Sequence, residues 1–171
     1  MRWFVVSPLV CLLAIGCQSI VPTPNSNESA LFERIKGKIS ISSQASSLSF
    51  DWTQEDGLHR LRFSSFGLWV ADFVTLGNEL SIRTADGEKW DQAAAELWMQ
   101  SNLGINLPFK SVAFWISGRP DPAHPSIRGD EAFTQLGWQV KINRLHKQGY
   151  PQKLTVENAG IKVKIAVSSW Q

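Results

Sequence analysis

The sequence predicts a mainly β protein with α-helices, in which one twisted antiparallel sheet is covered on one face by short helices. Three observations favour this fold. Apolar and polar residues alternate in many segments from residue 31 onward, two helical segments interrupt them mid-chain, and the regular strand–helix rhythm of a parallel sheet is missing. At 171 residues, the chain suits one domain with a sizeable core.

The first seventeen residues predict a lipoprotein signal peptide that ends at a cysteine. An apolar run over residues 3–16 is shorter than the ~20 residues that span a bilayer. It ends in Leu13-Ala14-Ile15-Gly16-Cys17, which resembles a bacterial lipobox and implies cleavage before Cys17 and acylation of its thiol and amine. The alternative is a plain secretory signal or an uncleaved anchor. Gln18 follows in place of the Asp of inner-membrane retention, which implies a lipid-anchored protein of the outer membrane facing the periplasm.

We therefore expect three segments along the chain. Residues 1–16 are the predicted signal peptide, and residues 17–30 are the acylated N-terminus and a tether rich in Pro, Ser and Asn. Residues 31–171 are the predicted folded domain.

Six alternating segments predict strands with one apolar and one wet face. Their apolar members are Ile35, Ile39 and Ile41; Leu48, Phe50 and Trp52; Leu61 and Phe63; Leu80 and Ile82; Trp138, Val140 and Ile142; and Ile161, Val163, Ile165 and Val167.

Two helices are expected between the fourth and fifth of these strands. Asp91 is a suitable N-cap for a helix over residues 92–103, and Gly104 suits the position after its end. A shorter helix is expected over residues 110–117, stopped by Gly118 and Pro120. A proline-rich loop follows over residues 119–128.

The composition argues against several function classes. A formal net charge of +2 disfavours a nucleic-acid binder. Both cysteines lie in the first seventeen residues, which excludes a disulfide framework and a Cys-based metal site in the folded part. No phosphate loop, His-Glu-x-x-His or Gly-x-Ser-x-Gly motif occurs, and the three histidines are far apart. We expect no catalytic residue, metal or cofactor, although a serine triad scattered along the chain stays open.

Eight tryptophans against one tyrosine need an explanation beyond core filling, although a core position is the simpler reading for any single one. A strongly curved sheet lined by large aromatics and covered only by short helices favours a cavity suited to an acyl chain. The candidate cavity residues are Leu48, Phe50, Trp52, Leu61, Phe63, Trp115, Trp138 and Val140.

The segment over residues 103–120 resembles a known family. Its sequence LGINLPFKSVAFWISGRP is similar to the Gly-x-x-Leu-Pro … Trp-hydrophobic-x-Gly-x-Pro signature of the LolB family. Supporting matches along the chain are Lys36-Gly37-Lys38-Ile39, Phe50-Asp51-Trp52, Gly137-Trp138, Pro151 with Leu154 and Val156, and Lys162-Val163-Lys164-Ile165. The resemblance covers essentially the whole chain after the signal peptide.

This resemblance implies an unclosed antiparallel half-barrel with short helices as a lid over a hydrophobic cavity. It also implies a non-enzymatic, monomeric receptor that takes acylated lipoproteins from a LolA-type periplasmic carrier and inserts them into the outer membrane. The alternative is a different lipid-binding or envelope-assembly lipoprotein that carries phospholipid or glycolipid on a similar half-barrel. A lipoprotein hydrolase with a scattered triad is a third possibility.

The family resemblance further implies a protruding loop that contacts outer-membrane lipid. The matching stretch is Ser64-Ser65-Phe66-Gly67-Leu68-Trp69, in which Phe66 stands where the family usually has Leu. We expect Phe66, Gly67 and Leu68 to form this membrane-insertion loop, with Phe66, Leu68 or Trp69 at its tip. The alternative is that Phe66 packs inward in a continuing strand.

Overall fold

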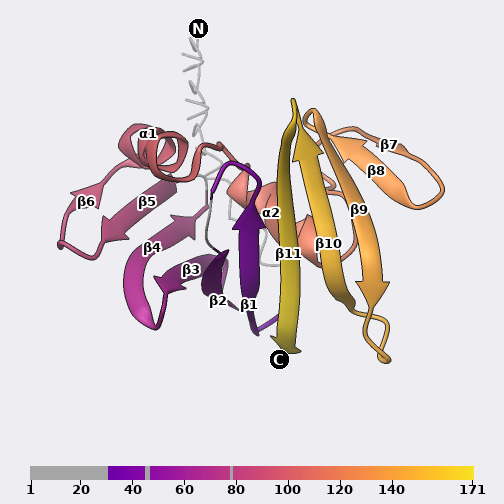
Figure 1. The fold of residues 1–171 in the computed structure, drawn as a ribbon, viewed down its shortest axis with the longest axis horizontal. Helices are drawn as coiled ribbons and strands as arrows, with labels where there is room; N and C mark the ends of the chain where they lie inside the picture. The colour runs from indigo at the N-terminus through magenta and orange to yellow at the C-terminus, as the bar shows by residue number, and fades with distance from the viewer. Residues whose placement is uncertain (1–30, 45–46, 78) are drawn as a thin grey trace, which may run out of the picture.

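The protein is an open antiparallel sheet with two short helices on one face (Figure 1). The computed structural model describes residues 31–44, 47–77 and 79–171. Within them, eleven strands form one sheet in the order β6-β5-β4-β3-β2-β1-β11-β10-β9-β8-β7, whose end strands β6 and β7 are not paired with each other. The predicted fold class, an unclosed and mainly β half-barrel with short helices, is confirmed.

The elements follow one another as strands, two helices and strands again. In chain order they are β1 (Arg34–Ile41), β2 (Ser47–Glu55), β3 (Leu58–Ser65), β4 (Leu68–Leu76), β5 (Glu79–Thr84), β6 (Lys89–Trp90), α1 (Gln92–Leu103), α2 (Phe109–Ile116), β7 (Ser126–Arg128), β8 (Ala132–Gln135), β9 (Trp138–Leu145), β10 (Pro151–Asn158) and β11 (Ile161–Trp170).

The strand order explains why the helices cover the inner face of the sheet. The first and last strands, β1 and β11, pair in its middle, where the N–H groups of Glu33 and Arg34 donate to the Gln171 carbonyl at 2.9 and 3.1 Å. The chain leaves the sheet at one end strand, β6, passes through both helices and re-enters at the other end strand, β7. The two helices therefore bridge the open side of the half-barrel.

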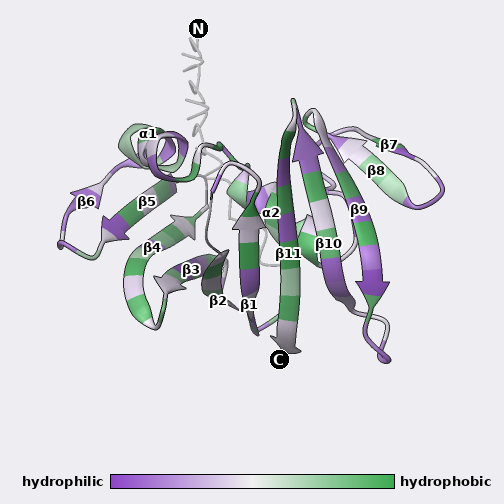
Figure 2. Cartoon of the chain, viewed as in Figure 1, coloured by the Kyte–Doolittle hydropathy of each residue, from purple (hydrophilic) through white to green (hydrophobic). Residues whose placement is uncertain are grey.

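The six alternating segments all lie in strands. Figure 2 shows hydrophobic and hydrophilic residues alternating along β1 and β11, and their apolar sides form the inner face. The inward residues of both strands belong to one core that also includes residues of α1 and α2. The sheet and both helices therefore share one hydrophobic core.

Five further strands are not apparent from alternation. β4 is buried on both faces, because Ala71 and Phe73 are buried on the inner face and Asp72 is buried on the outer face. β6, β7 and β8 have two, three and four residues, too few to show a period. β10 has register shifts beside Lys153. The predicted loop over residues 119–128 is correct only up to the start of β7.

Both predicted helices are present. Asp91 caps α1, since its Oδ1 accepts a hydrogen bond from the Ala94 N–H at 3.1 Å. Gly104 ends α1 in the left-handed conformation, with φ of 69°. α2 begins one residue earlier than predicted. No helix among the described residues is long and apolar enough to cross a membrane.

Gly37 brings β1 close to its neighbours. A Cβ at this position would overlap the Ala166 carbonyl oxygen of β11 and the ring of Phe50 on β2. The pairing of β1 with β11 also shifts register between Lys36 and Gly37. The missing side chain lets the Phe50 ring lie directly against the β1 backbone.

Candidate functional site

An apolar cavity lies between the inner face of the sheet and the two helices. Its volume is about 40 Å³, room for a few water-sized groups. Its lining comes from the sheet (Ile39, Phe50, Trp52, Leu61, Phe63 and Ile165), from α1 (Met99 and Leu103), from the connection between the helices (Ile105 and Leu107) and from α2 (Phe109, Val112 and Ile116). Every lining residue is apolar or aromatic, so the cavity offers burial and no charged group.

Four of the eight candidate cavity residues line this cavity. Phe50 pairs with Phe63, and Trp52 pairs with Leu61, across β2 and β3. Because each pair lies side by side on the inner face, two neighbouring strands supply one continuous wall. Trp52 is 2% exposed, and its indole N–H has no hydrogen-bond partner among the described residues.

The other four candidates lie outside this lining. Leu48 is half-buried near the start of β2, and Val140 is fully buried in β9. Trp138 lines a neighbouring surface groove. Trp115 is completely buried on α2 but does not face the cavity.

Trp115 instead anchors α2 to the second half of the sheet. Its indole N–H donates to Gln135 Oε1 at 2.7 Å, and the Asp121 N–H donates to the same oxygen at 2.9 Å. Gln135 Nε2 donates to the carbonyls of Asp121 and His124, each at 2.8 Å. Ser111 Oγ adds a hydrogen bond of 2.7 Å to Asp121 Oδ2. This buried network fixes α2, β8 and the loop between them, since its members would be costly to leave unpaired.

A larger open groove of about 540 Å³ adjoins the cavity. Met99, Leu107 and Phe109 line both spaces and so form the wall between them. Phe109 stacks on Phe73 with ring centroids 4.9 Å apart and meets the edge of Trp52 at 6.2 Å. The groove also has polar lining residues, namely Thr75, Gln92, Glu96, Asn106, Lys110, Ser111 and His124. A movement of the Phe109 ring would join the apolar cavity to a partly polar groove.

The β3–β4 hairpin ends in an exposed apolar tip, which we define as Phe66, Gly67 and Leu68. Phe66 is 97% exposed and Leu68 is 74% exposed, so the alternative of an inward-packed Phe66 is wrong. Trp69 turns back onto the sheet, where the Arg83 guanidinium lies 5.2 Å from its ring centroid.

The backbone of this tip is unfavourable for the residue it holds. Phe66 has a φ of 49° and Gly67 a φ of 81°, a turn that Asn-Gly or Asp-Gly fits best. The left-handed conformation costs a non-glycine residue about 1–2 kcal/mol. Phe66 is therefore unfavourable for folding stability on two grounds, its exposed apolar side chain and its left-handed backbone.

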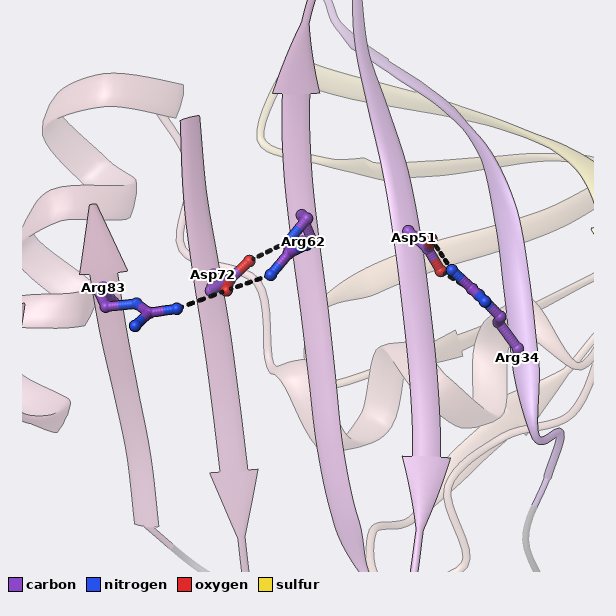
Figure 3. Close-up of polar contacts among 5 residues, drawn as sticks. All are labelled: Arg34, Asp51, Arg62, Asp72 and Arg83. Atoms are coloured by element: carbon purple, nitrogen blue, oxygen red, sulfur yellow. Dashed lines mark hydrogen bonds and ion pairs between the residues drawn. The ribbon is translucent and has the colours of Figure 1, made fainter. Parts of the chain in front are cut away.

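Opposite charges alternate in a row across the outer face of the sheet (Figure 3). Arg34 Nε donates to Asp51 Oδ1 at 2.8 Å, and this hydrogen bond lowers the pKa of the Asp51 carboxyl. Arg62 donates to both oxygens of Asp72 at 2.8 and 3.0 Å, and Arg83 donates to Oδ2 at 3.4 Å. Burial alone would raise the pKa of Asp72, but these two arginines outweigh it and hold that pKa below its ordinary value.

Replacing Asp72 with Asn should lower the free energy of unfolding by about 2 kcal/mol at pH 7, since both arginines lose their charged partner but remain half exposed. Because the pKa of Asp72 is lower in the folded state, its contribution is complete above the unfolded pKa and disappears as the pH falls through the folded one. Urea unfolding at pH 7 and pH 3 should therefore show a smaller difference between variant and wild type at pH 3. Asp130→Asn, at an exposed aspartate, is the control. An equal loss at both pH values would contradict this assignment.

Several predicted features lie outside the described residues, among them Cys17, the signal peptide and the tether. In the part of the chain that the structure covers, no group of three or more His, Cys, Asp or Glu residues is placed to hold a metal ion.

Comparison with known proteins relates the chain to one family along nearly its whole length. Residues 34–170 match the family model "Outer membrane lipoprotein LolB". Proteins named outer-membrane lipoprotein LolB are 25% identical in Thiobacillus denitrificans, 26% in Pseudomonas fluorescens and 24% in Coxiella burnetii. Each alignment covers 99% of this chain, and 97%, 96% and 93% of the respective relative. The Mycobacterium tuberculosis lipoprotein LppX, a solved structure, aligns over 81% of this chain and 86% of its own with 8% identity and a TM-score of 0.39.

Proposed function

Because the chain belongs to the LolB family of outer-membrane lipoproteins, we propose that it receives lipoproteins from a LolA-type periplasmic carrier and inserts them into the outer membrane. The family predicted from the sequence is confirmed, and with it a lipoprotein-related role at the outer membrane. The transfer from a carrier and the insertion step are the proposal.

The observation that carries this proposal is the wholly apolar lining of the cavity between sheet and helices. An acyl chain gains ~0.8 kcal/mol per methylene on leaving water, so a sixteen-carbon chain exposes on the order of 12 kcal/mol. A protein that shields such a chain needs an apolar interior and few polar groups. The aromatic wall of β2 and β3 supplies that surface.

Cargo binding requires the cavity to expand, because about 40 Å³ holds only a few methylene groups. The sheet side of the lining is held by continuous strand pairing, as in the pairing of β2 with both neighbours. On the helix side, Met99, Leu107 and Phe109 have the open groove behind them. We propose that the helices act as the lid and that the wall at Phe109 is where the cavity opens.

We propose that the exposed tip enters the membrane during insertion. Phe66 and Leu68 are among the most exposed large apolar residues of the described chain, and both would gain by contact with acyl chains. The role requires no bond-breaking step, so we propose a non-enzymatic protein that acts as a monomer. Its lipid anchor would be attached at Cys17.

A transfer assay tests the proposal. Purified protein is mixed with the carrier loaded with a triacylated lipoprotein, and phospholipid vesicles are then added. We expect the lipoprotein to move first to the protein and then to the vesicles, while the same cargo without acyl chains is not accepted. Mass spectrometry of co-purified lipid separates the alternative function. Retention of the lipoprotein on the carrier, together with bound free phospholipid or glycolipid, would contradict the receptor role.

A further inference from the structure

A row of outward-facing residues, three of them cations and none a carboxylate, crosses the outer face of the sheet and ends beside the hairpin tip. Successive cross-strand partners define this basic row from β9 to β3, and they are Arg144, Lys153, Ala166, Lys38, Ser49 and Ser64. Ser64 lies two residues before Phe66. The row therefore leads from β9, across the central strands β11 and β1, to the strand that carries the tip.

The cations of the basic row have no structural partner. In the neighbouring row, Asp51 and Asp72 alternate with arginines and bind them (Figure 3). Lys38, Lys153 and Arg144 are exposed and make no ion pair with any residue that the structure describes. Their charge is therefore available to a ligand.

The outer surface is hollowed along this row. A depression of about 630 Å³ is lined by the five cations Lys36, Lys38, Arg62, Arg144 and Lys153, with Asp51 as the single carboxylate. Both helices pack on the opposite face of the sheet, so none of the described elements covers the depression. Arg62 is paired with Asp72 and Lys36 with Asp51, so three unpaired cations, Lys38, Arg144 and Lys153, remain. Three unpaired positive charges around one depression suit a surface rich in phosphate groups.

The distance between the tip and the basic row matches the layering of a bilayer. Two residues of strand separate Ser64 from Phe66 by about 7 Å, and two strand spacings separate Lys38 from Ser64 by about 10 Å. The polar headgroup region occupies roughly 5–8 Å on each side of the hydrocarbon core. An apolar tip among acyl chains would thus bring the nearest cations to the level of the phosphates.

We propose that the basic row binds the phosphate groups of anionic phospholipids when the tip enters the bilayer. This inference rests on the proposed role of Phe66 at a membrane. It adds that the outer face of the sheet prefers anionic phospholipids. The position of the row beside an exposed apolar tip favours a bilayer over an acidic protein as the occupant.

Vesicle binding of matched variants tests this inference. The chain from residue 18 onward keeps every core residue that the structure describes and lacks the predicted anchor site Cys17, so its binding reports the domain without its lipid. One variant combines Lys38→Gln, Lys153→Gln and Arg144→Gln. The control combines Lys89→Gln, Arg128→Gln and Lys147→Gln, which remove the same charge from exposed positions outside the row. Each protein is titrated with vesicles of phosphatidylcholine alone or mixed with phosphatidylglycerol, at low and high salt.

We expect the row variant to bind phosphatidylglycerol vesicles roughly a hundredfold more weakly than wild type, with the control near wild type. The difference should vanish on neutral vesicles and at high salt. Equal losses in both variants would overturn the proposal, because net charge alone would then explain them. Normal vesicle binding with failed uptake from the carrier would overturn it in favour of a protein partner. No lipoprotein is used in the titration, so a failure of the transfer assay would be distinguishable.

Discussion

Replacing Phe66 with Asn should impair membrane insertion of lipoproteins by roughly tenfold to a hundredfold, the value of burying one phenylalanine side chain. The same change should leave the fold at least as stable as wild type. Asn tolerates the left-handed conformation that Phe66 adopts at φ 49°, so we expect a gain of about 1 kcal/mol in the free energy of unfolding. A variant with a higher free energy of unfolding and slower insertion would show that Phe66 serves membrane insertion and not folding stability.

The measurements are urea unfolding and transfer of lipoprotein from the protein to vesicles. Ala159→Asn is the matched control, since Ala159 has a φ of 47° at the equivalent position of the β10–β11 turn. It should share the gain in stability and keep normal insertion. Uptake from the carrier should be normal in both variants. Normal insertion of lipoproteins by Phe66→Asn would contradict the proposed role of the tip.

Replacing Phe109 with Ala should make acyl chains enter the protein roughly thirtyfold faster. The ring makes two aromatic contacts, with Phe73 and Trp52, and each such pair contributes ~1 kcal/mol to holding the wall closed. Without the ring, the cavity of about 40 Å³ and the groove of about 540 Å³ would no longer be separated at this point. Because Phe109 is half-buried, a loss of about 2 kcal/mol in folding stability is expected as well.

Stopped-flow binding of a fluorescent fatty acid measures this effect. Phe114→Ala is the control, because Phe114 lies on the same helix and is buried but lines neither space. It should reduce stability without accelerating uptake. If the control accelerates uptake as much as Phe109→Ala does, general loosening of α2 explains both, and the wall at Phe109 has no special role.

The sequence predicts the parts of the fold in which one face of a strand meets water. Alternation in β1, β2, β3 and β11 indicates the inner face, because each of these strands is polar on the outside. Alternation does not predict β4, because its outward Asp72 is buried by Arg62 and Arg83 from the strands on either side. Which arginines lie opposite a carboxylate depends on the register of neighbouring strands. The sequence alone does not show this register.

The candidate site could be predicted in part for a similar reason. The adjacent strands β2 and β3 alternate between apolar and polar residues, and their apolar side forms the cavity wall. This pattern identifies Phe50, Trp52, Leu61 and Phe63. Trp115 lies on a helix, and its direction is decided by the hydrogen bond to Gln135, twenty residues away. Phe109 stands inside the family-like segment, directly after Pro108, but only the packing of its ring against Phe73 marks it as a wall residue. Its helix position alone gives no such signal.

The course of β1 and β3 has a consequence for how the domain sits relative to its anchor. Both strands run in the same direction, so the start of β1 and the hairpin tip lie at opposite edges of the sheet. The eight residues of β1 span about 27 Å between those edges. The thirteen residues 18–30 have a contour length of at most about 45 Å. The tether is therefore long enough for a lipid attached to Cys17 and the Phe66 tip to touch one leaflet together, and the proposed anchor would set an upper limit on how far the domain can move from the membrane it serves.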